Sequence, residues 1–329
     1  MNKIPYLSSS PHIHSGASTE RIMLDVLIAL APASLVAVVL FGWQALLVLV
    51  LATGGCLATE ALCQLAMKRP LTLRDNSAAI TGVLLALNLP PSLPWWMVLL
   101  GAVIAILVGK QIYGGLGHNP FNPALVARVV LLISFPVQMT RWTAPEPFKF
   151  TVDGITAATP LGEMKSSVML TGKLPEALQA GYSDYLLGTM SGCIGEVSAV
   201  ALLIGAAYLF WRKVITWHIP FTFLGSAVLM SGLFWLVDGS RYPSPVFHLL
   251  TGGMLLGAFF MATDMVTSPV STRGMIIFGV GCGVLTILIR LFGGYPEGVS
   301  FAILLMNSAT PLIDRFTRPK VFGYQGETA

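Results

Sequence analysis

ITGVLLAL (residues 80–87) returns later in the chain as LTGGMLLGAFF (residues 250–260). Both stretches are short, apolar and glycine-bearing, and both run into polar or proline-rich sequence. After each comes a long apolar run that closes on a glycine pair, YGG at residues 113–115 and FGG at residues 292–294. This repetition predicts two halves of similar structure.

The composition around these stretches is that of a membrane protein. Of the 329 residues 55% are hydrophobic and 10% are charged, so there are too few charges to cover a soluble surface of this size. Apolar runs of about 20 residues, the length that crosses a bilayer, recur along the chain. Because the runs are continuous rather than alternating, we predict an all-α polytopic protein and exclude a barrel. No basic stripe for nucleic acid is present.

About ten transmembrane helices are expected. The third and eighth are too short to cross comfortably and are predicted to be broken or re-entrant. With five helices in each half, the halves have opposite orientations, a plan in which broken helices mark a binding site at mid-membrane. The predicted spans are residues 22–41, 44–66, 76–89, 95–113, 122–138, 187–211, 216–237, 246–264, 274–292 and 298–314.

The distribution of basic residues predicts the orientation, because cytoplasmic loops carry an excess of lysine and arginine. The predicted inner side collects Lys3, Arg21, Lys68, Arg69, Arg74, Lys110, Arg212, Lys213, Arg273, Arg315, Arg318 and Lys320. The outer side collects fewer: Arg141, Lys149, Lys165, Lys173, Arg241 and, at a helix end, Arg290. We therefore expect a cytoplasmic tail and first repeat in residues 1–138, a periplasmic segment in 139–186, and a second repeat with a cytoplasmic tail in 187–329.

Metal-binding patterns are weak. The four cysteines lie in apolar runs without C-x-x-C spacing, which indicates neither disulfides nor a cysteine-held iron site: Cys56, Cys63, Cys193 and Cys282. His12, His14 and His118 lack the further ligands that a metal needs. No metal site is predicted.

Ionisable residues at membrane depth are candidates for function, since burying them unpaired is costly. They are Asp25, Glu60, Lys110, Arg128, Glu196, Asp264 and Arg290. Several lie near span ends, where snorkelling explains them. For Glu60 and Glu196 a place in an ion path and a purely structural ion pair both stay open.

The largest segment between spans contains VDGITAATPLGEMKSS (residues 152–167). On local chemistry alone, Asp153 and Gly154 form a turn, and Thr159 caps a helix whose first residue is Pro160. The spacing of Asp153, Thr156 and Thr159 also resembles the flavinylation motif D-x-x-[S/T]-x-A-T.

That resemblance implies an FMN joined to Thr159 through a phosphoester bond by a separate flavin transferase. The acceptor is expected to be a hydroxyl on an exposed loop with small neighbours. A helix starting at Pro160 would present free backbone N–H groups to the phosphate. Ala157 stands where the motif often has Gly or Ser, at a loosely specified position.

Many further segments resemble the NqrB/RnfD family, and its Rnf-complex branch more than the sodium-pumping NADH:quinone reductase branch. They include SPHIHSGASTERIML (10–24), LRDNSAAITGVLLALNLPP (73–91), KQIYGGLGHNPFNPA (110–124), GAFFMATDMVTSP (257–269), RLFGGYPEGVSFAILL (290–305) and PLIDRFTRP (311–319). The resemblance implies a flavin-carrying subunit of a bacterial inner-membrane translocase. That complex couples electron transfer between a ferredoxin-type carrier and NAD to Na⁺ or H⁺ translocation, and no turnover is expected from this chain alone.

The family also implies partners and a second cofactor. The partners are the other membrane and peripheral subunits of the Rnf complex, and membrane lipid. The second cofactor is a non-covalent riboflavin between the halves, expected near Thr81 and Gly82 and near Thr251 and Gly252. Two alternatives remain: a secondary transporter or channel without flavin, and a scaffold that only anchors redox partners. The coupling ion and the direction of electron flow stay open.

Overall fold

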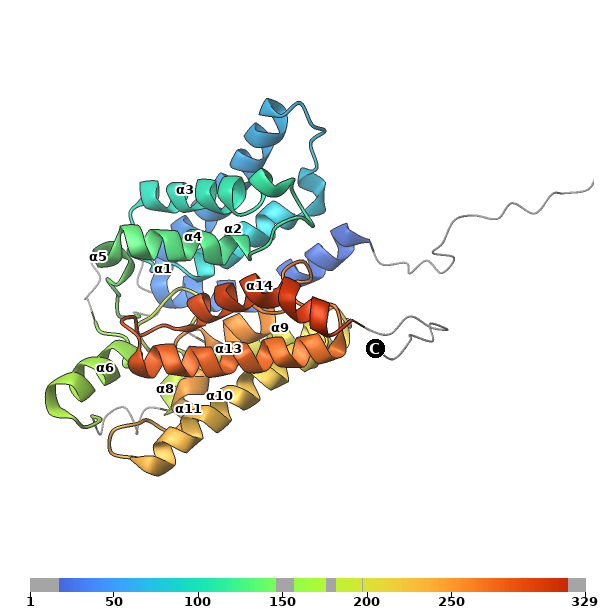
Figure 1. Cartoon of the computed structure of the whole chain (residues 1–329). Helices are drawn as coiled ribbons and strands as arrows, with labels where there is room; N and C mark the ends of the chain where they lie inside the picture. The colour runs from blue at the N-terminus through green and yellow to red at the C-terminus, as the bar shows by residue number, and fades with distance from the viewer. Residues whose placement is uncertain (1–17, 146–156, 176–181, 197, 319–329) are drawn as a thin grey trace, which may run out of the picture.

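The computed structural model describes residues 18–145, 157–175, 182–196 and 198–318 (Figure 1). Its regular elements are helices, which confirms the all-α prediction. Two residues of the predicted flavin motif, Asp153 and Thr156, lie outside the described residues. Thr159 lies within them.

The helices fall into three groups along the chain. The first group is α1 (Thr19–Ala66), η1 (Leu73–Asp75), α2 (Ser77–Leu87), α3 (Trp95–Val103), the π-helical η2 (Ile104–Val108), η3 (Gln111–Tyr113), α4 (Pro123–Ser134) and α5 (Pro136–Met139). The second is α6 (Pro160–Thr171) and α8 (Tyr182–Leu187). The third is α9 (Ala199–Trp211), α10 (His218–Val237), α11 (Pro245–Leu250), α12 (Met254–Leu256), the π-helical η4 (Gly257–Met261), α13 (Thr272–Phe292) and α14 (Val299–Phe316).

Several of these helices are long and apolar enough to cross a membrane. In the described residues four segments qualify: Thr19–Ala66, Trp95–Tyr113, His218–Val237 and Thr272–Phe292. The first is interrupted at Gly42, which has a positive φ of 61°, so its two parts correspond to the predicted first and second spans. Shorter apolar helices accompany them: Ser77–Leu87, Pro123–Ser134 and Ala199–Trp211. The chain is therefore a polytopic membrane protein.

The two ends of the described chain lie at the same end of the molecule. In Figure 1, α1 begins and α14 ends on the right, whereas α5 and α6 lie on the left. Helices α3, α4, α13 and α14 run between these two ends. The segment that carries Thr159 thus lies at the opposite end from both described termini.

Three predicted spans differ from the structure. The sixth was expected from residue 187, but α9 begins at Ala199, and residues 188–196 form turns that run past the end of α2. There Gly195 N donates to Leu87 O at 2.7 Å. The fifth was expected to reach residue 138, but α4 ends at Ser134 because Pro136 starts the separate helix α5. The third, α2, is short but unbroken.

The eighth predicted span is broken, as expected. Helix α11 ends at Leu250, and the chain restarts as α12 only at Met254. Between them Gly252 and Gly253 have φ values of 68° and 64°, a left-handed conformation that glycine adopts without strain. The glycines of LTGGMLLGAFF therefore form the break itself.

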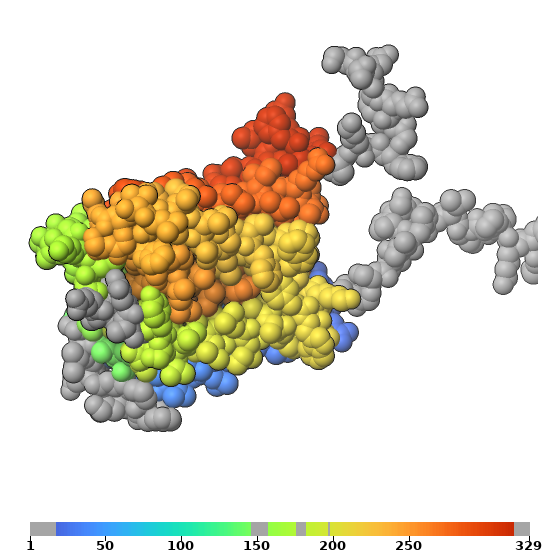
Figure 2. All heavy atoms as spheres, turned by 90° about the horizontal axis from the view of Figure 1, so that it is seen from below, coloured from blue at the N-terminus to red at the C-terminus, as the bar shows by residue number. Residues whose placement is uncertain are grey.

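Small residues bring the helices close together. On α13, a Cβ added to Gly279 would overlap Thr222 Oγ1 of α10, and one added to Gly283 would overlap Ser226 Oγ and Phe223 O. Glycines four residues apart let two helix backbones approach, which is how helices associate in lipid without a hydrophobic driving force. Helices α9 and α10 lie on the face shown in Figure 2, coloured yellow to orange. Several of their apolar side chains are exposed, among them Leu203, Ile204, Leu229 and Leu233.

Replacing Gly283 by Ala should separate α10 from α13. Because the added methyl group meets the backbone oxygen of Phe223, we expect a loss of about 1–3 kcal/mol in stability. The measurement is the thermal unfolding midpoint of the detergent-solubilised protein. Gly225→Ala on α10, where an added Cβ meets nothing within 4 Å, is the matched control. Equal midpoints for the two variants would contradict this packing.

Candidate functional site

Thr159 is the N-cap of α6. Its Oγ1 accepts a hydrogen bond from Gly162 N at 3.1 Å, and Pro160 occupies the first helical position. The predicted cap is confirmed. The expectation that Thr159 lies on an exposed loop is wrong, because the residue is only 5% exposed. The cap orders the residue, and the helix that follows it packs against the rest of the protein.

Helix α6 is held on two sides. Leu161 and Met164 pack in a small core with Tyr185, Met190 and Phe247. On the other side Lys165 Nζ donates to Gly293 O and, at 3.4 Å, to Tyr295 O. Burial lowers the pKa of Lys165. Burial, followed by the charge of Glu163, raises the pKa of Tyr185 to about 12. The position of Thr159 is therefore fixed against α11 and the α13–α14 connection.

The broken helix next to α6 is stabilised by a buried arginine. Arg290 is 0% exposed and donates to three carbonyl oxygens around the break: His248 O at 2.7 Å, Thr251 O at 2.8 Å and Gly252 O at 2.9 Å. Arg290 lies in the last turn of α13, at the helix end where the sequence placed it, but it does not reach solvent. It stays inside because the interrupted helix leaves carbonyls without N–H partners, and the guanidinium supplies the missing donors.

A second buried arginine gathers several chain segments. Arg128 of α4 donates to Asn88 Oδ1 and Ser300 Oγ, both at 2.9 Å, and to Cys193 Sγ at 3.3 Å. It forms an ion pair with Glu297 and approaches Glu196 at 3.8 Å. The apolar runs indicated Arg128 and Glu196 as candidates, but not Glu297, which lies in the α13–α14 connection outside every predicted span.

Glu60 belongs to a third polar cluster. Its carboxylate accepts from Lys110 Nζ at 2.7 and 2.8 Å and from the side-chain amides of Gln64 and Gln111, both at 3.2 Å. Lys110 is 2% exposed and also donates to Ser77 Oγ at 2.6 Å. Lys110, one of the ionisable residues expected at membrane depth, is therefore buried and paired. The geometry satisfies Glu60 fully, which favours the structural interpretation of this residue.

Buried Asp25 and half-buried Asp264 have partners as well. Asp25 accepts from Tyr208 and forms an ion pair with Arg212 at 3.0 Å. Asp264 accepts from Thr267 Oγ1 at 3.1 Å and from Val266 N at 3.4 Å. Asn122, in the predicted turn GHNPFNP, caps α4 through Ala124 N and Leu125 N.

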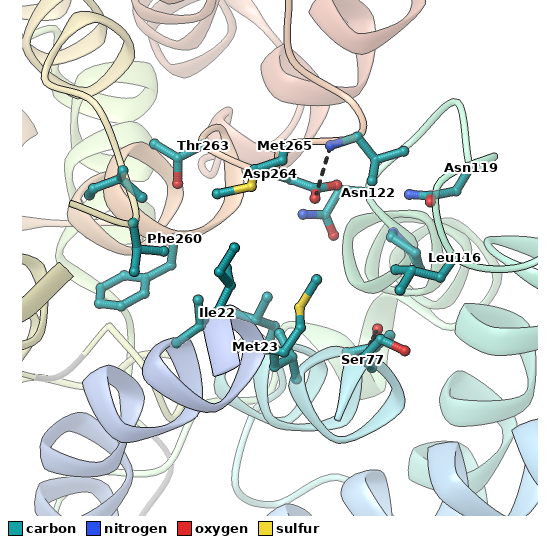
Figure 3. A pocket seen from close by; sticks show the side chains of 18 of the residues that line it. Ile22, Met23, Ser77, Leu116, Asn119, Asn122, Phe260, Thr263, Asp264 and Met265 are labelled. Carbon is teal, nitrogen blue, oxygen red and sulfur yellow. Dashed lines mark hydrogen bonds between the residues drawn. The ribbon is translucent and has the colours of Figure 1, made fainter. Parts of the chain in front are cut away.

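A cavity lies between α1, α2 and the segment that follows η4 (Figure 3). Ile22 and Met23 line one side, and Thr263, Asp264 and Met265 face them. Lys110, Ser77 and Thr81 also line it. The structure thus brings Thr81 to this cavity. It places Thr251 and Gly252 elsewhere, against Arg290 and next to Leu161.

The first turn of α6 fits a phosphate diester on Thr159. A helix start offers backbone N–H groups and the positive end of the helix dipole to an anion. Gly162 stands where a Cβ would come within 3.0 Å of Thr159 Oγ1, so the small residue leaves space at the hydroxyl. The donor set suits the group that the motif implies.

Replacing Arg290 by Lys should destabilise the protein although the charge is kept. A single ammonium cannot reach the three carbonyls that the planar guanidinium serves, and each buried acceptor left unpaired costs about 1–3 kcal/mol. The measurement is the yield of folded protein and its unfolding midpoint. Arg273→Lys, at the exposed start of the same helix, should leave both unchanged. Equal losses in both variants would contradict the assigned role.

Comparisons with known proteins agree with this architecture. The profile of the NQR2, RnfD, RnfE family matches residues 6–323. The chain is 48% identical over 317 residues to a subunit of the Na(+)-translocating ferredoxin:NAD(+) oxidoreductase complex of Acetobacterium woodii, covering 96% of this chain and 95% of that one. It is 44% identical over 349 residues to a subunit of the ion-translocating oxidoreductase complex of Citrobacter koseri, covering 97% and 99%. The chain therefore belongs to the NQR2, RnfD, RnfE family.

Proposed function

We propose that this chain is the flavin-carrying membrane subunit of a complex that couples electron transfer between a ferredoxin-type carrier and NAD to translocation of Na⁺ or H⁺. The observation that carries the proposal is the position of Thr159. It is the last residue of a D-x-x-T-x-A-T sequence, at the start of a helix suited to a phosphate, in a chain of this family. The names of the two relatives supply the reaction.

FMN joined to Thr159 would give the subunit a group that accepts and passes on electrons. The chain's own residues would hold that group in place. The N–H groups at the start of α6 would offer hydrogen bonds to the phosphate, Leu161 and Met164 anchor the helix in its small core, and Lys165 ties it to the α13–α14 connection. Because Thr159 is 5% exposed in the folded chain, the transferase is proposed to act before α6 packs.

The proposed orientation places both termini in the cytoplasm and α6 on the periplasmic side of a bacterial inner membrane. The excess of basic residues near one end of the predicted spans supports it. We also propose two inverted five-helix halves. Their support is the sequence repeat, with the short α2 in the first half and the broken α11–α12 in the second.

A second flavin, a non-covalent riboflavin, is proposed in the cavity between α1, α2 and η4. An electron source on one side of the membrane and FMN on the other are separated by about 30 Å of hydrocarbon, too far for one useful transfer. The cavity has a mostly apolar lining with a few polar groups, Ser77, Thr81, Asn119 and Asp264 among them, as cofactor sites do. It lies toward the end of the molecule where α1 begins.

The other subunits of the complex are the proposed partners. They would supply the binding sites for the ferredoxin-type carrier and for NAD, so the chain alone is not expected to turn over. A transporter without flavin and a scaffold that only anchors partners are the competing functions. Both differ from the proposal, because neither gives a flavin on Thr159 a role in electron transfer.

Thr159→Asn should abolish covalent flavin without removing the helix cap. Asparagine keeps an acceptor for Gly162 N but has no hydroxyl to esterify. In a host with the flavin transferase, the native band should fluoresce under ultraviolet light on a denaturing gel, and the Thr159→Asn band should be dark. Thr159→Ser, which keeps cap and hydroxyl, and Thr171→Ala at the far end of α6 are the controls. A dark native band would favour the transporter, and an active complex with a dark Thr159→Asn band would favour the scaffold.

Ile22→Trp should remove the second flavin and spare the first. The indole would fill the cavity that Ile22 lines, whereas Ile28→Trp, on an exposed face of the same helix, would leave the cavity open. Flavin released by denaturation, measured by chromatography, should fall to background in Ile22→Trp only, while gel fluorescence is unchanged. Equal release from both variants would exclude this cavity as the site.

A further inference from the structure

Two buried glutamates near Arg128 have oxygens that no donor serves. Glu196 is 7% exposed and Glu297 is 8% exposed, yet the Oε1 atom of each has no hydrogen-bond partner among the described residues. Cys193 lies beside them, and one ligand atom from each of the three residues falls within 4.8 Å of the others. A buried carboxylate oxygen without a partner is costly, and a cation or a further donor between the two glutamates would satisfy both oxygens.

The neighbouring arginines do not provide it. The guanidinium of Arg128 is occupied by Asn88, Ser300, Cys193 and Oε2 of Glu297. Its approach to Glu196 Oε1, at 3.8 Å, is too long for a hydrogen bond. Arg290 lies beside Gly252, next to the Gly253 that Glu196 approaches, but it directs its N–H groups at carbonyls of the broken helix. The two arginines balance the charge of the two glutamates without saturating their oxygens.

We infer that Glu196 and Glu297 form a binding site for one alkali-metal cation of sodium size. Carboxylate oxygens are hard ligands and suit hard cations. A cation midway between atoms no more than 4.8 Å apart lies at most about 2.4 Å from each, the distance range of Na⁺ and Ca²⁺ rather than of larger ions. The sulfur of Cys193 lies 3.3 Å from Asn88 O and 3.3 Å from the guanidinium of Arg128, so it already has partners, and the unpaired ligand atoms are the carboxylate oxygens.

The charge balance selects a monovalent ion. Arg128, paired with Glu297, and Arg290, beside Gly252, together offset the two carboxylates, so a bound Na⁺ adds one charge to the cluster and a bound Ca²⁺ adds two. The cost of a buried net charge rises steeply with its size, since Born energy follows the square of the charge. Na⁺ is therefore favoured over Ca²⁺ of the same radius.

The two adjacent glycines of the helix break connect this site to the helix that follows Thr159. A Cβ on Gly253 would come within 3.0 Å of Glu196 Oε1, and a Cβ on the adjacent Gly252 would overlap Leu161, two residues from Thr159. If the proposed function holds, a transported ion would pass close to the flavin here. Binding itself depends on the glutamates alone and stands or falls without the flavin.

Thermal unfolding of the assembled complex tests the site. Replacing choline chloride with NaCl at constant ionic strength should raise the unfolding midpoint of this chain by about 2–4 °C, because a ligand that binds only the folded state stabilises it. Glu196→Gln should abolish that rise, and Glu163→Gln, on the exposed face of α6, should preserve it. KCl should give a smaller rise than NaCl.

Several outcomes would overturn the inference. They are a wild-type midpoint indifferent to Na⁺, the same Na⁺ response in wild type and Glu196→Gln, a response to CaCl₂ but not NaCl, or a response to pH alone. If Glu196→Gln does not assemble, Glu297→Gln carries the same expectation, since its amide oxygen keeps the contact with Arg128. The covalent flavin, scored by gel fluorescence in the same samples, separates failure of this site from failure of the proposed function.

Discussion

The hydrogen bonds from Arg290 to the carbonyls of His248, Thr251 and Gly252 are the interaction on which the site depends. A helix cannot be interrupted inside a membrane protein unless its freed backbone groups find other partners. The guanidinium provides them, and the chain can then turn at Gly252 and Gly253. That turn makes room for Leu161 on one side and for the carboxylate of Glu196 on the other. The helix that begins after Thr159 and the buried charge cluster thus meet at one break.

Buried polar clusters tie together segments that are distant in sequence. Around Arg128 these are α2, α4, the turns at residues 188–196 and the start of α14. The Glu60–Lys110 pair likewise joins α1 to the segment after η2. Removing one partner of such a pair leaves an uncompensated charge, which is strongly destabilising, so these contacts specify how the helices are arranged. Glycines such as Gly283 then let the helix backbones approach.

Much of the fold was predictable from the sequence, because each long apolar run is a local signal of a spanning helix. The break in the eighth span was predictable as well, since two adjacent glycines are visible in the sequence. The start of α9 was not. Residues 188–196 carry three glycines, of which Gly188 has a positive φ of 95°, and contacts such as Gly195 N to Leu87 O hold the segment in turns. The ionisable residues within apolar runs behave similarly. The position of such a residue in its run predicts its depth in the membrane, but it does not identify the residue with which it pairs.

The candidate site was predictable only in part. Thr159 was found by its motif and its cap by the following proline, but its burial depends on α8 and α11, which no local pattern reveals. Glu297 was missed because it lies in a polar connection that folds back into the protein. Its pairing with Arg128 spans 169 residues of sequence, far beyond what local patterns can predict.

The proposed function requires a flavin covalently joined to this chain at Thr159, at the start of the helix that packs on the broken α11–α12 segment. Mass spectrometry of the proteolytic peptide that contains Thr159, from protein purified with its native complex, detects that bond. We expect a mass increase equal to FMN less one water, with fragment ions placing it on Thr159. An unmodified peptide at full abundance, or the same adduct on a different residue, would rule out covalent flavin at Thr159.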